Sequence, residues 1–470
     1  MNYIHPEANG QLTFSDSCSE FLMIPAGLPR FNNSFTETAR SESDREVFVF
    51  YGSLDPFEDE NICTHCGCKM HVNNTFDVNL RHLCFGSSLS SLRFKKVQYY
   101  CPDCHKTRMQ EIPFKAADHR ITTALEQYAM DLLALGYTNK EVAELTGLGK
   151  NTVKAIDKKR LQEKYTLDGK TLIKPERPTK LIGIDEFTLH NGYRYATHIV
   201  DLQTGHVLWI QAGKKKQVVY DFIDHVGMDW MEHVEAVACD MNSDFQEAFE
   251  ERCEWIQPVF DYFHIVKNFN DKVVSEVRKD EQRRLLENGE IEAARSLKKT
   301  RYILTSKRSS LQRKDAEARE GKVVHKGSDL FGTEDIKRTE GYEAKYDELI
   351  SQNKLLFTAD LIKEKLHYAY SLMDEVNMAK EINEIIELCD ETENEHFLWF
   401  SRLLSKHYTG IIAHATYQIS TGKIEGINNK IKTLRRKGYG YPDDEYFFLK
   451  IIDASRRDYV RNPKSHRICD

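Results

Sequence analysis

The sequence predicts a mixed α/β protein with a central sheet, a long helical tract after it and two small modules before it. Three observations support this prediction. Short β-rich runs alternate with helical patterns between residues 180 and 264, residues 265–420 carry charged side chains at helical spacing, and two cysteine pairs precede two helical patterns near the N-terminus. At 470 residues the chain is longer than one hydrophobic core usually supports, so roughly two to four domains are expected.

Composition places the chain among soluble globular proteins and argues against a membrane protein. Apolar residues make up 40% and charged residues 30%, and no stretch approaches eighteen consecutive apolar residues. The first residues, MNYIHPEANGQLTF, lack a basic stretch followed by an apolar core, so we expect neither a secretion signal nor a transit peptide, and a cytoplasmic protein. Eleven cysteines are too sparse for a disulfide scaffold at this length, which favours reduced thiols.

The first 112 residues are predicted to comprise a loosely ordered lead-in and a zinc-binding module. Residues 1–60 are rich in Ser, Asn, Pro and acidic side chains and show weak periodicity. Residues 61–112 contain two Cys-x2-Cys pairs, Cys63/Cys66 and Cys101/Cys104, with the spacing at which thiolates bind one tetrahedral Zn²⁺. Four protein ligands leave no position for water, which favours a structural ion.

The spacer between the cysteine pairs is long, so the module needs a further element to close. Thirty-four residues separate Cys66 from Cys101, and a β-hairpin is expected to bring the pairs together. Two alternatives remain open, which are buried thiols without metal and a ligand set that includes other side chains: Cys68, Cys84, His65 or His105.

Residues 118–165 have the pattern of a helix-turn-helix domain. Apolar residues recur at helical spacing in ITTALEQYAMDLLALG and EVAELTGLGKNTVKAI, Thr138 and Glu141 form a capping-box pattern, and Gly147 marks the turn. Because the first residues of a recognition helix lie nearest the major groove, four residues are candidate DNA contacts: Lys150, Asn151, Thr152 and Lys154. A plain helical hairpin is the alternative.

A local excess of positive charge supports this assignment. The formal net charge of the chain is −7, yet residues 150–180 contain ten Lys or Arg against four Asp or Glu. This segment is predicted to face a phosphate backbone, with a solvated linker as the alternative.

The order of elements between residues 180 and 264 matches a ribonuclease H-like core. LIGIDEF, YRYATHIVD and HVLWIQAG are β-rich runs separated by turn residues, as in a three-strand meander. A helix over Gln217–Val226, a strand VEAVACD, a helix through Glu251 and a strand WIQPVFDYF follow. Residues 265–420 are predicted to be an inserted α-helical domain without a convincing strand, residues 421–455 the last part of the core, and residues 456–470 a basic tail.

Two aspartates are candidate metal ligands in this core. Asp185 lies inside an apolar β-rich run, and Asp240 ends VEAVACD. Ligands of open α/β sheets gather beyond the carboxyl ends of strands, so adjacent strands would present both carboxylates together. Alternation along the strand directs Glu186 to the opposite face. Each aspartate alone also fits a helix cap, and Asp240 would then accept from the backbone near Asn242 and Ser243.

The third candidate acid is Glu425 in TGKIEGINNKIKTLRRKGYGY. Glu425, Asn428 or Asn429, Lys432 and Arg436 recur at helical spacing and therefore share one face. Carboxylate oxygens are the ligands that Mg²⁺ prefers, and cations on the same face suit phosphates. We therefore expect Glu425 to hold metal and Lys432, Arg435 and Arg436 to contact DNA; the alternative is a solvated amphipathic helix.

The segments GIDEF, ACDMNSDF, FDYFHIVKNFN and KIEGINNKIKTLRRKGYGY, in this order, resemble the ISL3 family of bacterial insertion-sequence transposases. The resemblance covers roughly residues 60 to 455, and the cysteine pairs agree with it. Its most specific segment is EGINNKIK with the Arg-Arg-Lys-Gly-Tyr-Gly that follows. Thr-Gly-Lys-Ile before Glu425 departs from the Ser-Asn-type start of the family, which puts the local loop contacts in doubt.

The resemblance implies a DNA transposase of the DDE type. Asp185, Asp240 and Glu425 take the three positions of the triad, with Mg²⁺ or Mn²⁺ between them and the helical insertion between the second and third acids. The implied substrates are double-stranded terminal inverted repeats and target DNA, the implied compartment is the bacterial nucleoid, and the need to synapse two ends implies at least a dimer.

His264 resembles the histidine of the family's D-x-F-H segment. It is expected either to contact phosphate or to support a metal ligand, with a core or capping role as the alternative.

Two other functions fit the same modules. A DNA-binding regulator would use the zinc and helix-turn-helix modules with a core reduced to a dimerisation scaffold, which three intact carboxylates disfavour. A metal-dependent nuclease would cut DNA without strand transfer.

Overall fold

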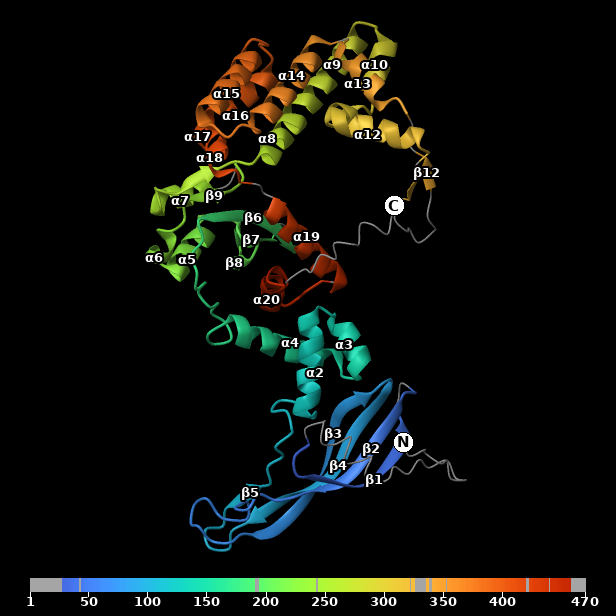
Figure 1. The fold of residues 1–470 in the computed structure, drawn as a ribbon, viewed down its shortest axis with the longest axis vertical. Helices are drawn as coiled ribbons and strands as arrows, with labels where there is room; N and C mark the ends of the chain where they lie inside the picture. The colour runs from blue at the N-terminus through green and yellow to red at the C-terminus, as the bar shows by residue number, and fades with distance from the viewer. Residues whose placement is uncertain are drawn as a thin grey trace. The chain divides into compact units, whose positions relative to one another are not determined.

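The computed structural model describes residues 28–41, 44–190, 194–241, 244–321, 323–325, 335–337, 340–351, 353–419, 422–438 and 440–457. These residues fall into two compact units, shown with their elements in Figure 1. The N-terminal unit comprises Met1–Ile173 and Lys432–Ala454, and the central unit comprises Lys174–Ile431 and Ser455–Asp470.

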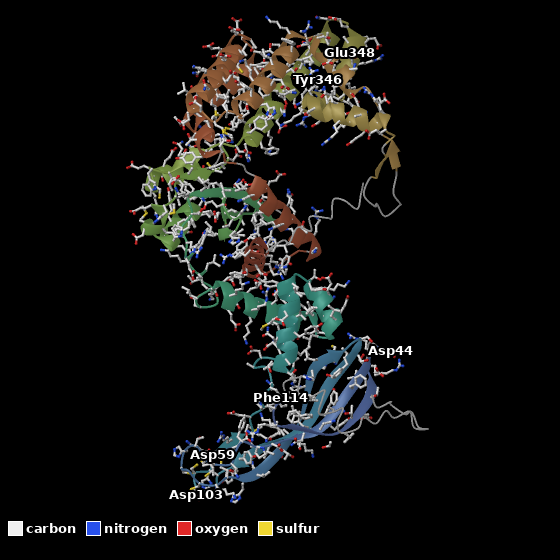
Figure 2. The ribbon with its side chains drawn as sticks, viewed as in Figure 1. Asp44, Asp59, Asp103, Phe114, Tyr346 and Glu348 are labelled. Carbon is white, nitrogen blue, oxygen red and sulfur yellow. The ribbon has the colours of Figure 1, made fainter. Side chains whose placement is uncertain are left out.

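The N-terminal unit begins with a five-stranded sheet in the order β1-β2-β4-β3, with β5 paired to β4. Strands β2 and β4 are parallel and the other pairs antiparallel. Leu80, Leu92 and Phe114 are buried at its core, and Phe114 is labelled in Figure 2. The strands are β1 (Phe31–Arg40), β2 (Glu46–Leu54), β3 (His71–Phe85), β4 (Ser88–Tyr100) and β5 (Thr107–Met109).

The prediction of a loosely ordered lead-in over residues 1–60 is wrong for residues 31–54, which form β1 and β2. Strand β2 buries Val47, Val49 and Phe50 between two neighbours, whereas β1 lies at the sheet edge and exposes most of its polar side chains. An edge strand needs only one apolar contact face, so its composition resembles that of a loop. Residues 1–27 lie outside the described residues.

Three helices follow the sheet and pack on one another around Leu125, Leu133 and Val153. A capping box joins Thr138 and Glu141, as predicted, and Gly147 ends the second helix at a φ of 69°. The C-terminal helix of the chain also belongs to this unit. The helices are α2 (Thr123–Leu135), α3 (Asn139–Thr146), α4 (Lys150–Tyr165) and α20 (Asp444–Ser455).

The sheet of the central unit has the strand order β10-β9-β6-β7-β8. Strands β6, β7 and β8 form the predicted antiparallel meander, while β9 and β10 join parallel to β6. The elements are β6 (Leu181–His190), β7 (Arg194–Asp201), β8 (Val207–Ala212), α5 (Lys216–Val226), α6 (Met228–Met231), β9 (Ala236–Ala238), α7 (Asp244–Arg252) and β10 (Gln257–Val259).

Helices dominate the rest of the central unit, and most of them gather in one group in Figure 1, whereas α19 lies beside β6 and β7. They are α8 (Tyr262–Phe269), a π-helix η1 (Asn270–Val274), α9 (Ser275–Glu287), α10 (Ile291–Leu297), α11 (Arg301–Leu304), α12 (Arg308–Arg319), α13 (Tyr342–Ser351), α14 (Lys354–Ala369), α15 (Glu375–Asp390), α16 (Glu395–Lys406), α17 (Tyr408–Ile412), α18 (His414–Tyr417) and α19 (Gly422–Lys437).

The prediction that residues 265–420 lack strands is wrong at one place, because β11 (Val323–His325) pairs antiparallel with β12 (Asp335–Lys337). Each strand has three residues, which is too short for a period of two to register in the sequence.

One hydrophobic cluster runs from the sheet into the helical group. It includes Ile182 of β6, Phe249 of α7, Phe269 of α8 and Tyr346 of α13, the last labelled in Figure 2. The helical tract therefore shares a core with the sheet.

Candidate active site and metal centres

The parallel pairing of β6 with β9 places the two candidate aspartates opposite each other. Leu181, Ile182 and Gly183 pair with Ala236, Val237 and Ala238. Continued by two residues, this register sets Asp185 against Asp240. Parallel neighbours lie about 5 Å apart, so both carboxylates reach the same region of the sheet edge.

Both aspartates project from one face of the sheet. Ile182 and Ile184 are buried on one side with Val237 and Cys239, while Ala236 and Ala238 contact Ile424 on the other. Because successive side chains alternate, Asp185 and Asp240 share the face that α19 covers. The alternative that Asp240 caps a helix concerns Asn242 and Ser243, which lie outside the described residues.

The first half of α19 packs directly on β6. A Cβ on Gly183 would lie 2.5 Å from Cδ1 of Ile424, so glycine is what allows this close approach. Two residues further along β6, Oδ2 of Asp185 accepts a hydrogen bond of 2.7 Å from Nδ2 of Asn428. At the start of the helix, Lys423 Nζ donates to the backbone oxygen of Leu202 at 2.6 Å.

These contacts fix the position of Glu425. It lies one residue after Ile424 and three before Asn428, hence within one helical turn of the group that contacts Asp185. Its side chain is exposed, and helical spacing places it on the same side of α19 as Asn428.

Asp185 and Asp240 lie on the face of the sheet on which α19 packs, but the carboxylate oxygens of Asp185, Asp240 and Glu425 do not all lie within 4.8 Å of one another. Among the described residues, the groups whose ligand atoms all lie within 4.8 Å of one another are Cys63/Cys66/Cys101/Cys104, Cys66/Cys68/Asp103 and Asp280/Glu395/His396. The sequence-predicted triad is not among them. The structure thus brings together the elements that carry the acids, without closing the carboxylates around a common centre.

Negative charge accumulates around this face. Burial raises the pKa of the Glu186 carboxyl, and Lys214 opposes that effect. The carboxylates of Asp185, Asp240 and Asp244 raise the pKa further. Carboxylates gathered in this way repel one another, and a divalent cation neutralises such a set.

Histidines surround the two aspartates. Nδ1 of His264, on α8, lies 3.9 Å from Oδ1 of Asp240, which places this predicted auxiliary residue beside the second acid. His407 is buried near Asp240, and burial lowers its pKa.

His198 pairs with Asp185 across β6 and β7 and is fully buried. Burial lowers its pKa to about 4, against the opposite effect of Asp185. Sequence analysis missed both His198 and His407. The alternation of YRYATHIVD could have placed His198 on the Asp185 face.

Asp201 has a structural role in the turn after β7. Its Oδ1 accepts from the hydroxyl of Thr179 at 2.7 Å and from the backbone N–H of Gln203 at 2.8 Å. It therefore fixes the turn before Thr204-Gly205.

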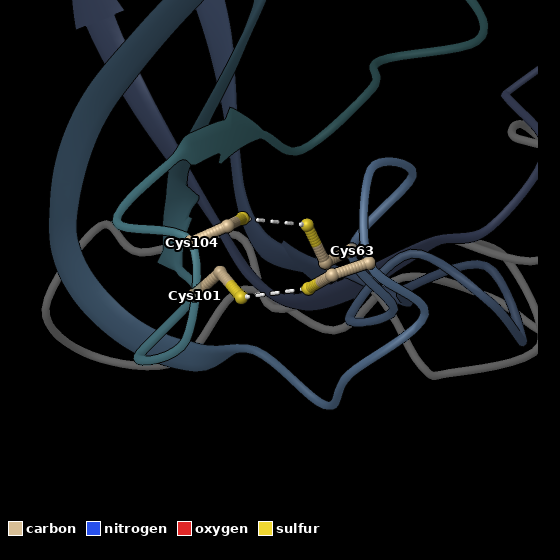
Figure 3. Close-up of side chains that lie close together, drawn as sticks. Cys63, Cys101 and Cys104 are labelled. Atoms are coloured by element: carbon tan, nitrogen blue, oxygen red, sulfur yellow. Dashed lines mark hydrogen bonds between the residues drawn. The ribbon is translucent and has the colours of Figure 1, made fainter.

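The four predicted zinc ligands converge at one end of the N-terminal sheet, as Figure 3 shows. Cys63 Sγ lies 3.3 Å from Cys104 Sγ, and Cys66 Sγ lies 3.4 Å from Cys101 Sγ. The antiparallel β3–β4 hairpin occupies the long spacer and brings the two cysteine pairs together, as predicted. A tetrahedral ion with Zn–S bonds of about 2.3 Å requires sulfurs about 3.8 Å apart, so the four thiols fit zinc.

The local backbone favours the thiolate form of Cys63. Backbone N–H groups of Cys66 and then His65 lower the pKa of Cys63 to about 6. Gly67 and His105, each directly after the second cysteine of its pair, adopt φ values of 74° and 59° that close the two turns. Hydrogen bonds from backbone N–H groups to a cysteine sulfur favour the thiolate, which is the form that binds metal.

The alternative ligands are placed differently. Cys84 directs its thiol to the backbone oxygens of Leu145 and Thr146. His105 pairs with the hydroxyl of Tyr100, whereas Cys68 stays close to Cys66 and Asp103.

Comparisons with known proteins agree with this arrangement. A family model described as a transposase matches residues 182–451, and a model described as the helix-turn-helix domain of transposase family ISL3 matches residues 110–161. The first match covers more than half of the chain. The chain belongs to the ISL3 family of transposases.

Curated relatives are similar over most of their length. The transposase for insertion sequence element IS1001 of Bordetella parapertussis is 27% identical over 85% of this chain and 90% of its own. The transposase for insertion sequence element IS1557 of Mycobacterium tuberculosis is 24% identical over 77% of this chain and 78% of its own. Within the part of the chain that the structure describes, no helix has the length and apolar character needed to cross a membrane.

The helix-turn-helix of this ISL3 transposase exposes part of its predicted contact set. Lys150 and Asn151 are exposed at the start of α4, and Thr152 is half-buried. Lys154 instead pairs with Asp443 at 3.2 Å and lies over the ring of Tyr446. Lys150 and Asn151 are therefore the residues of the set best placed to contact DNA.

The compact units divide the segment 421–455 differently from the predicted core boundary, because the division falls within α19, after Ile431. Lys432 and Arg436 are exposed in the last turns of this helix. Arg435 lies over the ring of Phe447 at 5.6 Å and packs within the N-terminal unit.

A buried ionic network attaches α20 to α4. The carboxylate of Asp157 is fully buried and accepts from Lys450 at 2.8 Å, Tyr446 at 2.6 Å and Arg160 at 2.8 Å. Asp453 of α20 accepts from the Tyr165 hydroxyl at 2.8 Å.

Proposed function

We propose that this transposase is a DDE enzyme that binds the terminal inverted repeats of its insertion sequence, cuts DNA at their ends and joins the 3′ ends to target DNA. In this proposal the central unit is a ribonuclease H-like core with a helical insertion, and Asp185, Asp240 and Glu425 hold Mg²⁺ or Mn²⁺. The observation that carries it is the shared face of β6 and β9, on which α19 lies with Asn428 bonded to Asp185.

The proposal assigns a role to each of these side chains. Asp185, Asp240 and Glu425 would supply the oxygen ligands, and bound divalent ions supply activation of the attacking oxygen and stabilisation of the leaving oxygen. Asn428 holds Asp185 in position, and His264 lies beside Asp240.

The reaction conserves phosphodiester bonds during joining. Hydrolysis forms one P–O bond to water, breaks one P–O bond and leaves a free 3′-hydroxyl. In transfer, that hydroxyl attacks a target phosphodiester and displaces another 3′-hydroxyl.

The N-terminal unit would recognise the element ends. Lys150 and Asn151 lie where a recognition helix meets the major groove, and Lys432 and Arg436 are positioned for phosphates. A structural zinc ion at the four cysteines would hold the end of the β3–β4 hairpin. Because two element ends must be joined in one reaction, we expect at least a dimer on DNA.

The first prediction tests the triad by removing charge while keeping shape. D185N, D240N and E425Q are each expected to lower cleavage of an end-containing duplex by at least about a thousandfold, since each removes a metal ligand. Binding of the same duplex in a gel-shift assay is expected to stay within about twofold of wild type.

The matched control is D229N, because Asp229 is an exposed carboxylate of the same unit, on α6. Its cleavage is expected to equal that of wild type. Wild-type cleavage by all three triad variants would refute the assignment. Pre-cut ends that are never joined to target DNA would favour a nuclease, and an inactive wild-type protein that still binds ends would favour a regulator.

A further inference from the structure

A cavity of about 500 Å³ opens where α8 and the π-helix η1 meet α9, α11 and the connection that precedes α11. This volume falls within the range of small-molecule sites. Its lining includes Phe263, Lys267, Asn270, Arg278, Lys299 and Tyr302.

The cavity wall is cationic. Lys267, Arg278, Lys299 and Arg301 line it together with a single carboxylate, Asp271, which Arg301 pairs at 2.6 Å. Lys267 and Lys299 are exposed and form no ion pair with the described residues. A net positive wall with two such lysines suits a phosphate group.

Two aromatic rings stand exposed at the same cavity. Phe263 is 56% exposed and Tyr302 is 44% exposed. Every nucleobase has a π-face that stacks on such rings, whatever its sequence.

Two polar atoms of the lining residues, Nε of Arg278 and Oδ1 of Asn270, are buried and have no hydrogen-bond partner among the described residues. Asn270 begins the π-helix, a feature that recurs at functional sites.

The cavity lies close to Asp240, the second candidate acid. Phe263 precedes His264 on α8, and the rings of these residues meet edge to face at 5.8 Å. His264 in turn lies 3.9 Å from Asp240. A ligand against Phe263 is thus one side chain away from the second acid.

We propose that this cavity binds one unpaired nucleotide of the DNA strand, with its base against Phe263 and Tyr302 and its phosphate at Lys267 and Lys299. The proposal rests on the proposed function, since a DNA strand must reach Asp240. It assigns to the helical tract the task of holding an unstacked nucleotide next to the scissile bond, as enzymes that extrude a base do.

The test uses the full-length protein without added divalent metal and a short single-stranded oligothymidylate carrying one 2-aminopurine. Stacking of the probe base on the rings is expected to quench its fluorescence. F263A is expected to weaken binding roughly tenfold and to abolish most of the quenching. K267E is expected to weaken binding and to lower the slope of log affinity against log salt by about 0.7, the value for one single-strand phosphate contact.

Matched controls separate the cavity from general surface effects. Phe357 is 58% exposed on α14 of the same unit and does not line the cavity, so F357A is expected to bind like wild type. Lys272 is exposed on the π-helix and also lies outside the cavity lining, so K272E controls for the loss of charge. Thermal unfolding of each variant confirms that the fold is kept.

The cavity assignment is overturned if F263A and K267E bind and quench the probe as wild type does, or if F357A and K272E lose as much. This result is independent of the triad, because D185N is expected to bind and quench the probe normally. Failure of the triad assignment would instead appear as cleavage by D185N with the probe data unchanged.

Discussion

At the scale of single residues, Gly183 decides how closely α19 approaches the sheet. A methyl group there would lie 2.5 Å from Ile424 Cδ1 and 2.9 Å from Leu202 Cδ2. We expect G183A to destabilise the protein by about 1–3 kcal/mol through overpacking and to reduce cleavage, because the helix that carries Glu425 must shift. Urea unfolding and a cleavage assay measure the two effects.

A second substitution on α19 is expected to relieve this overpacking. G183A/I424V removes the clashing Cδ1 and is expected to recover part of both losses. G426A, on the same helix with nothing within 4 Å of the added Cβ, is expected to be at least as stable as wild type. A G183A protein with unchanged stability and activity would show that α19 does not lie on β6.

His82 gives the N-terminal unit an acid-sensitive point. Its ring is 2% exposed and pairs with the Thr122 hydroxyl that caps α2, and burial lowers its pKa to about 4. The unfolded chain, with a pKa near 6.5, takes up the proton first as pH falls. The stabilising contribution is thus complete above about pH 6.5 and is lost progressively towards pH 4.

At pH 5 this linkage corresponds to a loss of about 2 kcal/mol relative to pH 7. Urea unfolding of wild type and H82Q at both pH values measures it. The variant is expected to lose less stability on acidification, and an equal loss in both proteins would contradict the assignment.

At the scale of elements, the zinc module shows what spacing alone can determine. Two Cys-x2-Cys pairs predicted the four thiols that the structure brings together and the need for a hairpin, because ligand geometry is local and strict. The edge strand β1 and the three-residue strands β11 and β12 were missed because their composition carries no periodic signal.

The sequence predicted the acids of the candidate site but not its buried histidines. Apolar context singled out Asp185 and Asp240, and helical spacing grouped Glu425 with Asn428 or Asn429. Alternation along β7 assigns His198 to one face of the strand, but its pairing with Asp185 depends on strand register, and the position of His407 depends on helix packing between distant segments.

Zinc removal tests the module directly. C101S is expected to lose bound zinc and to bind DNA ends at least about tenfold more weakly, since a module this small depends on its metal to fold. C84S, whose thiol faces α3, is expected to keep both properties. Zinc content by mass spectrometry and gel shift provide the readouts, and full zinc occupancy in C101S would refute the ligand set.

At the scale of the whole molecule, the N-terminal unit is completed by the last helix of the chain. Lys450 of α20 neutralises the fully buried Asp157 of α4. K450M is expected to cost about 3 kcal/mol, because it leaves a buried carboxylate with fewer partners. Urea unfolding measures the loss.

The double variant D157N/K450M removes the charge as well and is expected to be more stable than K450M alone. If K450M unfolds at the same urea concentration as wild type, α20 does not stabilise the unit through this pair.

The late position of α19 and α20 along the chain also bears on translation. Translation reaches Gly422 after α4 and the central sheet, yet α20 belongs to the N-terminal unit and the first part of α19 to the central unit. A nascent or prematurely terminated polypeptide therefore lacks Glu425 and leaves Asp157 without Lys450. Contacts between segments far apart in sequence, such as Asp157 with Lys450 and Gly183 with Ile424, thus form only after translation has passed both partners, and the folding of each unit is completed late.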